Sequence, residues 1–155
     1  MRTRKINIIF LLLIIILNII YSQEVHSQKV GKIIVKVKGL KNDKGYVRSH
    51  LYNDPATFPL EAPKSMKRIV VKPKNKEATL VFENIPYGTY ALDIHHDENA
   101  NEEMDRSVLG YPKEGFGLSN NPKLSIKIPQ FDQCKFTLYD SVKVITIYVK
   151  YLPKV

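Results

Sequence analysis

Residues Lys32 to Lys38 read Lys-Ile-Ile-Val-Lys-Val-Lys, and this stretch decides the fold class. Every second residue from Ile33 to Val37 is apolar and would point to one side of an extended chain, while the lysines would point to the other. Such alternation is typical of a β-strand with one buried face. Since no clear helical period follows residue 22, we expect an all-β protein.

Related patterns recur along the chain and predict seven or eight strands. Besides the first, they cover residues 46–52, 69–71, 78–82, 90–94, 124–128, 136–138 and 145–151. The run at 69–71 is continuously apolar, which suggests burial on both faces. Turn-forming sequences at 42–45, 73–76 and 85–88 separate the strands. Short strands with short connections predict an antiparallel β-sandwich.

The N-terminus has the layout of a secretory signal peptide. A basic head, Met-Arg-Thr-Arg-Lys, precedes an apolar run from Ile6 to Tyr21. That run falls short of the roughly 17–25 residues of a membrane-spanning helix, although an uncleaved anchor is the alternative. We therefore expect a signal peptide at 1–22, a short linker at 23–29 and one β-sandwich domain at 30–153. The protein would be exported, to the periplasm, the cell surface or the medium, with no stable transmembrane span after cleavage.

A single cysteine, Cys134, cannot close a disulfide within the chain. It alternates with Phe136 and Leu138, so we expect it at a buried, apolar strand position. The exported domain would then depend on packing for its stability.

The segment from Asp97 to Asp105 holds five acidic residues in nine, within a chain of formal net charge +9. Its oxygen-bearing side chains stand at positions 1, 3, 5 and 9 of a calcium-loop spacing, with a backbone carbonyl available at position 7. The candidate calcium ligands are Asp97, Asn99, Asn101, Glu103 and Asp105. Calcium is the one cofactor that the sequence suggests.

This loop is not an EF-hand, because Val108 occupies position 12, where a bidentate glutamate belongs, and no helices flank it. Glu102, Glu114 or Asp93 would have to complete the coordination. The alternative is a solvated acidic turn in which the side chains cap the backbone.

Two histidines precede the acidic loop and raise the question of zinc. Neighbouring strand residues point to opposite faces, so His95 and His96 cannot easily bind one metal ion. We expect His96 to pair with Asp97 or with a backbone carbonyl.

The long connection from Asp97 to about Pro122 is predicted to be an ordered loop across one end of the sandwich. Gly110, Gly115 and Gly117 would permit positive-φ turns in it.

Three stretches carry a family resemblance. They are Ile85-Pro86-x-Gly88-x-Tyr90-Ala91, His96-Asp97-Glu98-Asn99-x-Asn101-x-x-x-Asp105 and Leu109-Gly110-x-Pro112-x-Glu114-Gly115-x-Gly117-x-Ser119-Asn120-Asn121. With them, most of the chain after the signal resembles the exported bacterial family known as domain of unknown function 2141. The resemblance implies an immunoglobulin-like or transthyretin-like β-sandwich, export, and no established activity. The family commonly has glycine at the position of Glu102, and often at that of Ala100.

These features together predict a non-enzymatic, exported binding module that acts at the cell envelope or outside the cell. Its ligand face would be the 97–121 loop, where the further candidates are His96, Glu114, Ser119, Asn120 and Asn121. A partner would be an envelope polysaccharide or another exported protein. Nucleic acid is not expected, because export separates the protein from it.

Two alternatives remain open. One is a structural accessory domain without an ion, whose outward lysines only keep strand faces soluble. The other is a carbohydrate-active enzyme that uses the loop carboxylates. The chain has no tryptophan and no Gly-x-Ser-x-Gly motif.

Overall fold

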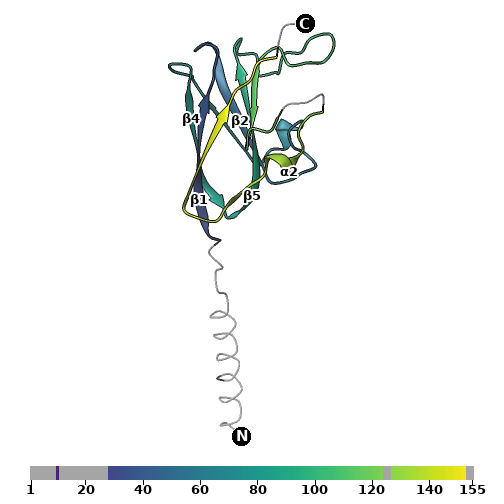
Figure 1. Cartoon of the computed structure of the whole chain (residues 1–155). Coiled ribbons are helices and arrows are strands. Elements are labelled where there is room, and N and C mark those ends of the chain that lie inside the picture. Colours follow the sequence, from purple (N-terminus) through teal and green to yellow (C-terminus); the bar gives the residue numbers. More distant parts are fainter. Residues whose placement is uncertain (1–9, 11–27, 124–126, 153–155) are drawn as a thin grey trace.

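Two β-sheets lie face to face, and residues from both fill the space between them (Figure 1). The computed structural model describes residue 10, residues 28–123 and residues 127–152. Its elements are β1 (Val30–Lys38), β2 (Tyr46–Tyr52), η1 (Ala62–Lys64), β3 (Lys67–Val71), β4 (Ala78–Pro86), β5 (Gly88–Asp97), β6 (Gly115–Leu118), α2 (Phe131–Cys134), β7 (Phe136–Leu138) and β8 (Val142–Tyr148). The predicted all-β sandwich is confirmed.

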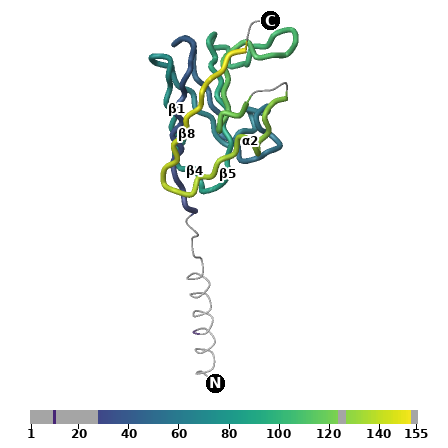
Figure 2. The backbone as a smooth tube through the Cα atoms, in the orientation of Figure 1, coloured from purple at the N-terminus to yellow at the C-terminus, as the bar shows by residue number. Residues whose placement is uncertain are grey.

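The first sheet has the order β4-β1-β8. β1 pairs antiparallel with β4 and parallel with β8, so the first and last strands lie side by side (Figure 2). The parallel pair joins distant parts of the chain, whereas the turn signals predict only antiparallel neighbours. The alternation of the opening stretch is correct, because Ile33, Val35 and Val37 are all buried.

The second sheet has the order β3-β2-β5-β6, and β7 pairs with the beginning of β5. Its inner face contributes Val47 and Leu51 from β2, and Leu92 and Ile94 from β5, to the core between the sheets. Burying a side chain of this size stabilises the fold by about 1.5–3 kcal/mol relative to its exposed state.

Two strand predictions need comment. Among the described residues the sixth strand is β6, which lies inside the predicted long loop. Residues 124–126 lie outside the described residues, and Lys127 and Ile128 are not in a strand. The run at 69–71 is not buried on both faces, because β3 is the last strand of its sheet and Val70 is exposed.

Cys134 is buried, as expected, but it ends the short helix α2 and is not in a strand. The expected signal peptide falls on residues outside the described ones, apart from Phe10. Within the described ranges, no helix is both long enough and apolar enough to cross a membrane.

The outer face of the five-stranded sheet divides into an apolar half and a polar half. The apolar half forms a second hydrophobic cluster, of Tyr52, Phe58, Ala91, Leu118, Phe131 and Cys134, which α2 helps to cover. The polar half continues along the same strands and carries the candidate site.

Candidate functional site

Pairing between strands places the polar side chains of the outer face in two rows. In one row, Arg68 of β3 pairs with His50 of β2, which pairs with Asp93 of β5. In the next row, Arg48 of β2 pairs with His95 of β5. Directly paired residues of adjacent strands have Cβ atoms about 4.5–5.5 Å apart, so these side chains are immediate neighbours. Arg48, His50 and His95 are all buried, which is unusual for an outer sheet face.

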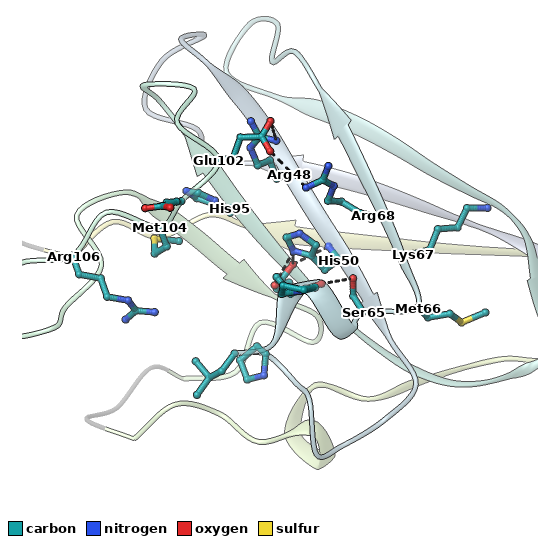
Figure 3. A pocket seen from close by; sticks show the side chains of 16 residues that line it. Arg48, His50, Ser65, Met66, Lys67, Arg68, His95, Glu102, Met104 and Arg106 are labelled. Carbon is teal, nitrogen blue, oxygen red and sulfur yellow. Dashed lines mark hydrogen bonds and ion pairs between the residues drawn. The ribbon is translucent and has the colours of Figure 1, made fainter.

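These rows form the floor of a recess of about 720 Å³ (Figure 3). One wall is the 59–68 segment, which includes η1, and the opposite wall is the 102–106 segment of the acidic loop. The walls add apolar surface from Pro59, Leu60, Pro63, Met66 and Met104. The volume lies within the roughly 300–1,000 Å³ range of small-molecule sites.

Arg48 connects the recess to the acidic loop. Its Nε donates to Asp97 Oδ2 over 2.7 Å, and its Nη1 lies 3.4 Å from Glu102 Oε1. Arg68 approaches the other oxygen of Glu102 at 3.8 Å. Burial works to raise the pKa of Asp97, but the Arg48 hydrogen bond and two backbone N–H donors outweigh it and hold that pKa below its usual value.

Asp93 fixes the histidine on the floor. Its Oδ1 accepts hydrogen bonds from the His50 backbone N–H at 2.8 Å and from His50 Nδ1 at 2.9 Å. Its Oδ2 accepts from the Tyr52 hydroxyl at 3.1 Å. Burial and the adjacent Asp93 raise the pKa of Tyr52, so its hydroxyl stays a proton donor. The Asp93 carboxylate thus serves the recess floor, and its part in completing a calcium site stays a prediction.

Asp97, the first candidate calcium ligand, organises the backbone of the acidic loop. Its Oδ1 accepts the Asn101 N–H at 3.1 Å and its Oδ2 accepts the Glu102 N–H at 3.1 Å. Ala100 and Glu102 have positive φ angles of 61° and 70°. Glu102 stands at position 6 of the calcium-loop spacing, where the chain must turn sharply. The loop thus makes that turn without the usual glycine.

The remaining candidates gather around Asp105. Asn99 Nδ2 donates to Asp105 Oδ2 at 2.9 Å, and Asn101 Nδ2 lies 3.2 Å from Asp105 Oδ1. The Glu103 N–H is bound by Asn101 Oδ1 at 3.0 Å. The side chains of Asn99 and Asn101 therefore both reach Asp105, while the buried Asp97 holds the loop backbone.

Glu114 fastens the two ends of this loop together. Its Oε1 accepts the Glu98 N–H at 3.0 Å, and its Oε2 accepts the Asp105 N–H at 3.3 Å and contacts His95 Nε2 at 2.7 Å. His95, Asp97 and Glu114 offer ligand atoms within 4.8 Å of one another. Each of the three already has a partner in hydrogen bonding or an ion pair, so we interpret the group as a structural network. Glu114 thus holds the backbone of the loop, and Glu102 contacts Arg48 and Arg68.

The chain matches a family model over residues 35–146, which is most of its length and includes the loop and the floor strands. That family is described as an uncharacterized protein conserved in bacteria, domain of unknown function 2141. The chain belongs to this family. Searches among curated proteins and among solved structures found no match.

In this member of the domain of unknown function 2141 family, His96 is fully buried and faces away from the recess. Its Nε2 lies 3.0 Å from the carbonyl of Lys44, which confirms the expected pairing with a backbone carbonyl, and its Nδ1 lies 2.6 Å from the Tyr151 hydroxyl. Burial raises the pKa of Tyr151. His96 is thus an interior residue and not part of a ligand face.

Ser119, Asn120 and Asn121 of the domain of unknown function 2141 motif bind backbone groups. The Ser119 hydroxyl donates to the carbonyl of Cys134 at 2.7 Å. Asn120 Nδ2 donates to the carbonyl of Lys135 at 2.8 Å, and Asn121 Nδ2 to that of Thr146 at 2.9 Å. All three side chains, predicted as ligand candidates, therefore hold the backbone in place.

Of the three glycines predicted to permit positive-φ turns, Gly110 follows the prediction, and Gly115 and Gly117 do not. Gly110 has a φ of 82°, as a tight turn requires. Gly115 and Gly117 lie in β6 without positive φ, and a Cβ at either would come within 2.7 Å of side chains from the C-terminal part of the chain. The absence of a side chain at Gly115 and Gly117 therefore lets β6 pack closely against Ile147, Val149 and Tyr151.

The sequence did not indicate that Arg48 and His50 belong to a site. Arg48 and His50 occupy the outward positions of an alternating strand, where polar residues ordinarily face water. A signal was present in β5, where Asp93, His95 and Asp97 place three ionisable groups at every second position. Only the pairing of β2 with β5 brings the two sets together.

Proposed function

We propose that this chain is an exported, non-enzymatic binding module whose Asp97–Asp105 loop takes up a calcium ion. The observation that carries the proposal is that Asn99 and Asn101 both reach Asp105, while Asp97 binds the backbone N–H of Asn101. Carboxylate, carboxamide and backbone oxygens are the ligands that calcium prefers.

The loop retains the coordination capacity that an ion needs. A carboxylate offers about four lone-pair positions, and Asp97 uses three of them, for two backbone N–H groups and Arg48. One position remains. A bound calcium ion would take the place of the hydrogen bonds that Asn99 and Asn101 donate to Asp105. The Glu103 carbonyl would supply a further oxygen. Loops of this kind in extracellular modules have dissociation constants of about 10⁻⁴–10⁻³ M.

An ion in this loop would make the wall of the recess more rigid, because Glu102, Glu103 and Met104 belong to both. Export is supported by the basic and apolar N-terminal layout. A partner at the cell envelope, such as a polysaccharide or another exported protein, fits a polar recess of this size better than nucleic acid, which export removes from reach.

The test is thermal unfolding of residues 23–155 in calcium, with magnesium as the ion control. A calcium concentration ten times the dissociation constant adds about 1.4 kcal/mol to the free energy of unfolding. For a domain of this size, that raises the melting temperature by roughly 5 °C. Magnesium would give a much smaller shift, because it demands strict octahedral geometry.

Two matched variants make the test specific. Asp105→Asn removes a ligand carboxylate and should abolish most of the calcium shift. Glu103→Gln removes the same charge from a residue that offers only its carbonyl, and should keep the shift. If wild-type protein shows no rise at millimolar calcium, the ion-free accessory domain becomes the better account.

A further inference from the structure

The recess floor presents a histidine whose outer nitrogen is free to bind a ligand. Asp93 accepts from His50 Nδ1, and because Asp93 also accepts from Tyr52 and from the His50 backbone, it acts only as an acceptor. The imidazole proton therefore sits on Nδ1. In the described part of the chain Nε2 has no hydrogen-bond partner, and no buried side-chain polar atom is left unpaired, so Nε2 reaches the space of the recess.

Arginines frame the same space. Arg68 pairs across the sheet with His50, and Arg106 lines the recess from the acidic-loop wall (Figure 3). Each guanidinium has five N–H donors, yet Arg106 donates only to the carbonyl of Gly110 at 3.0 Å among the described residues. Most of the donor capacity of both side chains is unused.

Glu102 stands where a ligand carboxylate would stand. It lies 3.4 Å from Arg48 and 3.8 Å from Arg68, beyond the roughly 2.7–2.9 Å of a tight charge-assisted hydrogen bond. Its side chain is 61% exposed. A loosely held, exposed carboxylate between two arginines can be displaced by a second carboxylate that reaches the same donors.

The walls restrict which anion fits. Asp93, Glu102 and Glu103 also line the recess and would repel a phosphate dianion more strongly than a single carboxylate. The free His50 Nε2 accepts a hydrogen bond, which calls for a ligand hydroxyl. Pro59, Leu60 and Met104 add apolar surface against which a saturated ring can pack.

We propose that this recess binds a sugar acid, with its carboxylate on Arg48 and Arg68 in place of Glu102 and a ring hydroxyl donating to His50 Nε2. This assignment rests on the recess alone and does not require calcium in the loop. The same chemistry occurs in a free uronic acid and in a uronate unit of a polysaccharide.

The experiment is calorimetric titration of residues 23–155 with galacturonate, in buffer with and without calcium. Galactose, which lacks the carboxylate, shows whether that group is needed. Acetate, which lacks the ring and its hydroxyls, shows whether those are needed. Inorganic phosphate shows whether the recess is a general anion site. We expect saturable binding of galacturonate that exceeds binding of each of the other three by about tenfold or more, since a hydrogen bond to a charged group contributes that much. Equal binding of galactose, acetate or phosphate would overturn the proposal.

Variants locate the site. Arg68→Gln, on an exposed side chain, should weaken galacturonate binding about tenfold or more, and His50→Ala should do the same. Lys36→Gln, an exposed position on the other sheet, is the matched control and should have no effect. Melting curves verify that each variant is folded. Unchanged binding by folded Arg68→Gln would contradict the assignment even if the His50 variant unfolds.

A galacturonate oligomer distinguishes the two sources. Tighter binding of the oligomer than of the monomer indicates a polysaccharide ligand, and equal binding indicates a free acid; absence of binding to both removes the proposal. The calcium site is tested separately, by the shift in melting temperature, so a failed sugar-acid site and a failed calcium site give separate results.

Discussion

Arg48 and Asp97 form a buried ion pair that joins the recess to the acidic loop. Arg48 Nε lies 2.7 Å from Asp97 Oδ2, and the two side chains are 6% and 0% exposed. On the loop side Asp97 holds the backbone of Asn101 and Glu102, and on the recess side Arg48 contacts Glu102. One pair therefore fixes the geometry of both candidate sites.

Replacing Arg48 should destabilise the fold strongly. Arg48→Met leaves the Asp97 carboxylate buried without its cation, and removing one partner of a buried pair costs about 3–5 kcal/mol. Chemical unfolding in urea gives the value. The double variant Arg48→Met with Asp97→Asn should be more stable than the single Arg48 variant. If the stability lost in the double variant equals the sum of the losses in Arg48→Met and Asp97→Asn alone, the two side chains are not coupled as described.

Acid should remove the contribution of Asp97. Its folded-state pKa is lower than the unfolded value of about 3.9, so its stabilisation is complete above that value and is lost as the pH falls through the folded-state pKa. The free energy of unfolding, measured in urea between about pH 6 and pH 2, should fall more for wild type than for Asp97→Asn. Parallel curves would show that Asp97 makes no such contribution.

Glycine at position 100 should stabilise the loop. Ala100 has a φ of 61°, and left-handed geometry costs a non-glycine residue about 1–2 kcal/mol. The added freedom of glycine in the unfolded chain costs roughly 0.4–1 kcal/mol, so Ala100→Gly should gain up to about 1 kcal/mol. Ala56→Gly, at an exposed turn without positive φ, is the control and should lose stability. The comparison uses melting temperatures.

Removing the Glu114 carboxylate should loosen the base of the acidic loop. Glu114→Gln loses the charge that accepts from Glu98, Asp105 and His95, and we expect a cost of about 1–3 kcal/mol. Hydrogen exchange should quicken at the amides of Glu98 and Asp105. Glu77→Gln, in an exposed ion pair with Lys38, should cost less than about 1 kcal/mol. Equal effects of both changes would refute the structural role.

The thiol of Cys134 should be nearly inert in the folded protein. Burial raises its pKa to about 11, and the thiolate is the reactive form. Labelling with iodoacetamide near pH 8 should be at least about a hundredfold slower than in urea. The exposed variant Val108→Cys, made with Cys134→Ser, supplies a fast reference in folded protein. Rapid labelling of native Cys134 would contradict its burial.

The strands that alternate cleanly could be predicted from the sequence, and the glycine-rich one could not. β1 is visible because every second residue is a buried β-branched side chain. β6 is hidden because Gly115 and Gly117 have no side chain to show the period, although they occupy inward positions against Ile147, Val149 and Tyr151. The parallel pairing of β1 with β8 depends on contacts between the chain ends, which local turn signals do not describe.

The acidic loop could be recognised from residue spacing, whereas the recess could not. Asp97, Asn101 and Asp105 are close in sequence, so their convergence follows from local turns. Arg48 and His95 meet only through the register of β2 against β5. A slip of one residue would turn every one of these side chains to the other face, and a single sequence does not specify that register.

The most direct test of calcium binding is a crystal structure of residues 23–155 grown in millimolar calcium. The account predicts one ion at the centre of the loop, about 2.3–2.6 Å from oxygens of Asp97, Asn99, Asn101 and Asp105 and from the carbonyl of Glu103. Density for water alone there, with both asparagine amides still donating to Asp105, would contradict it.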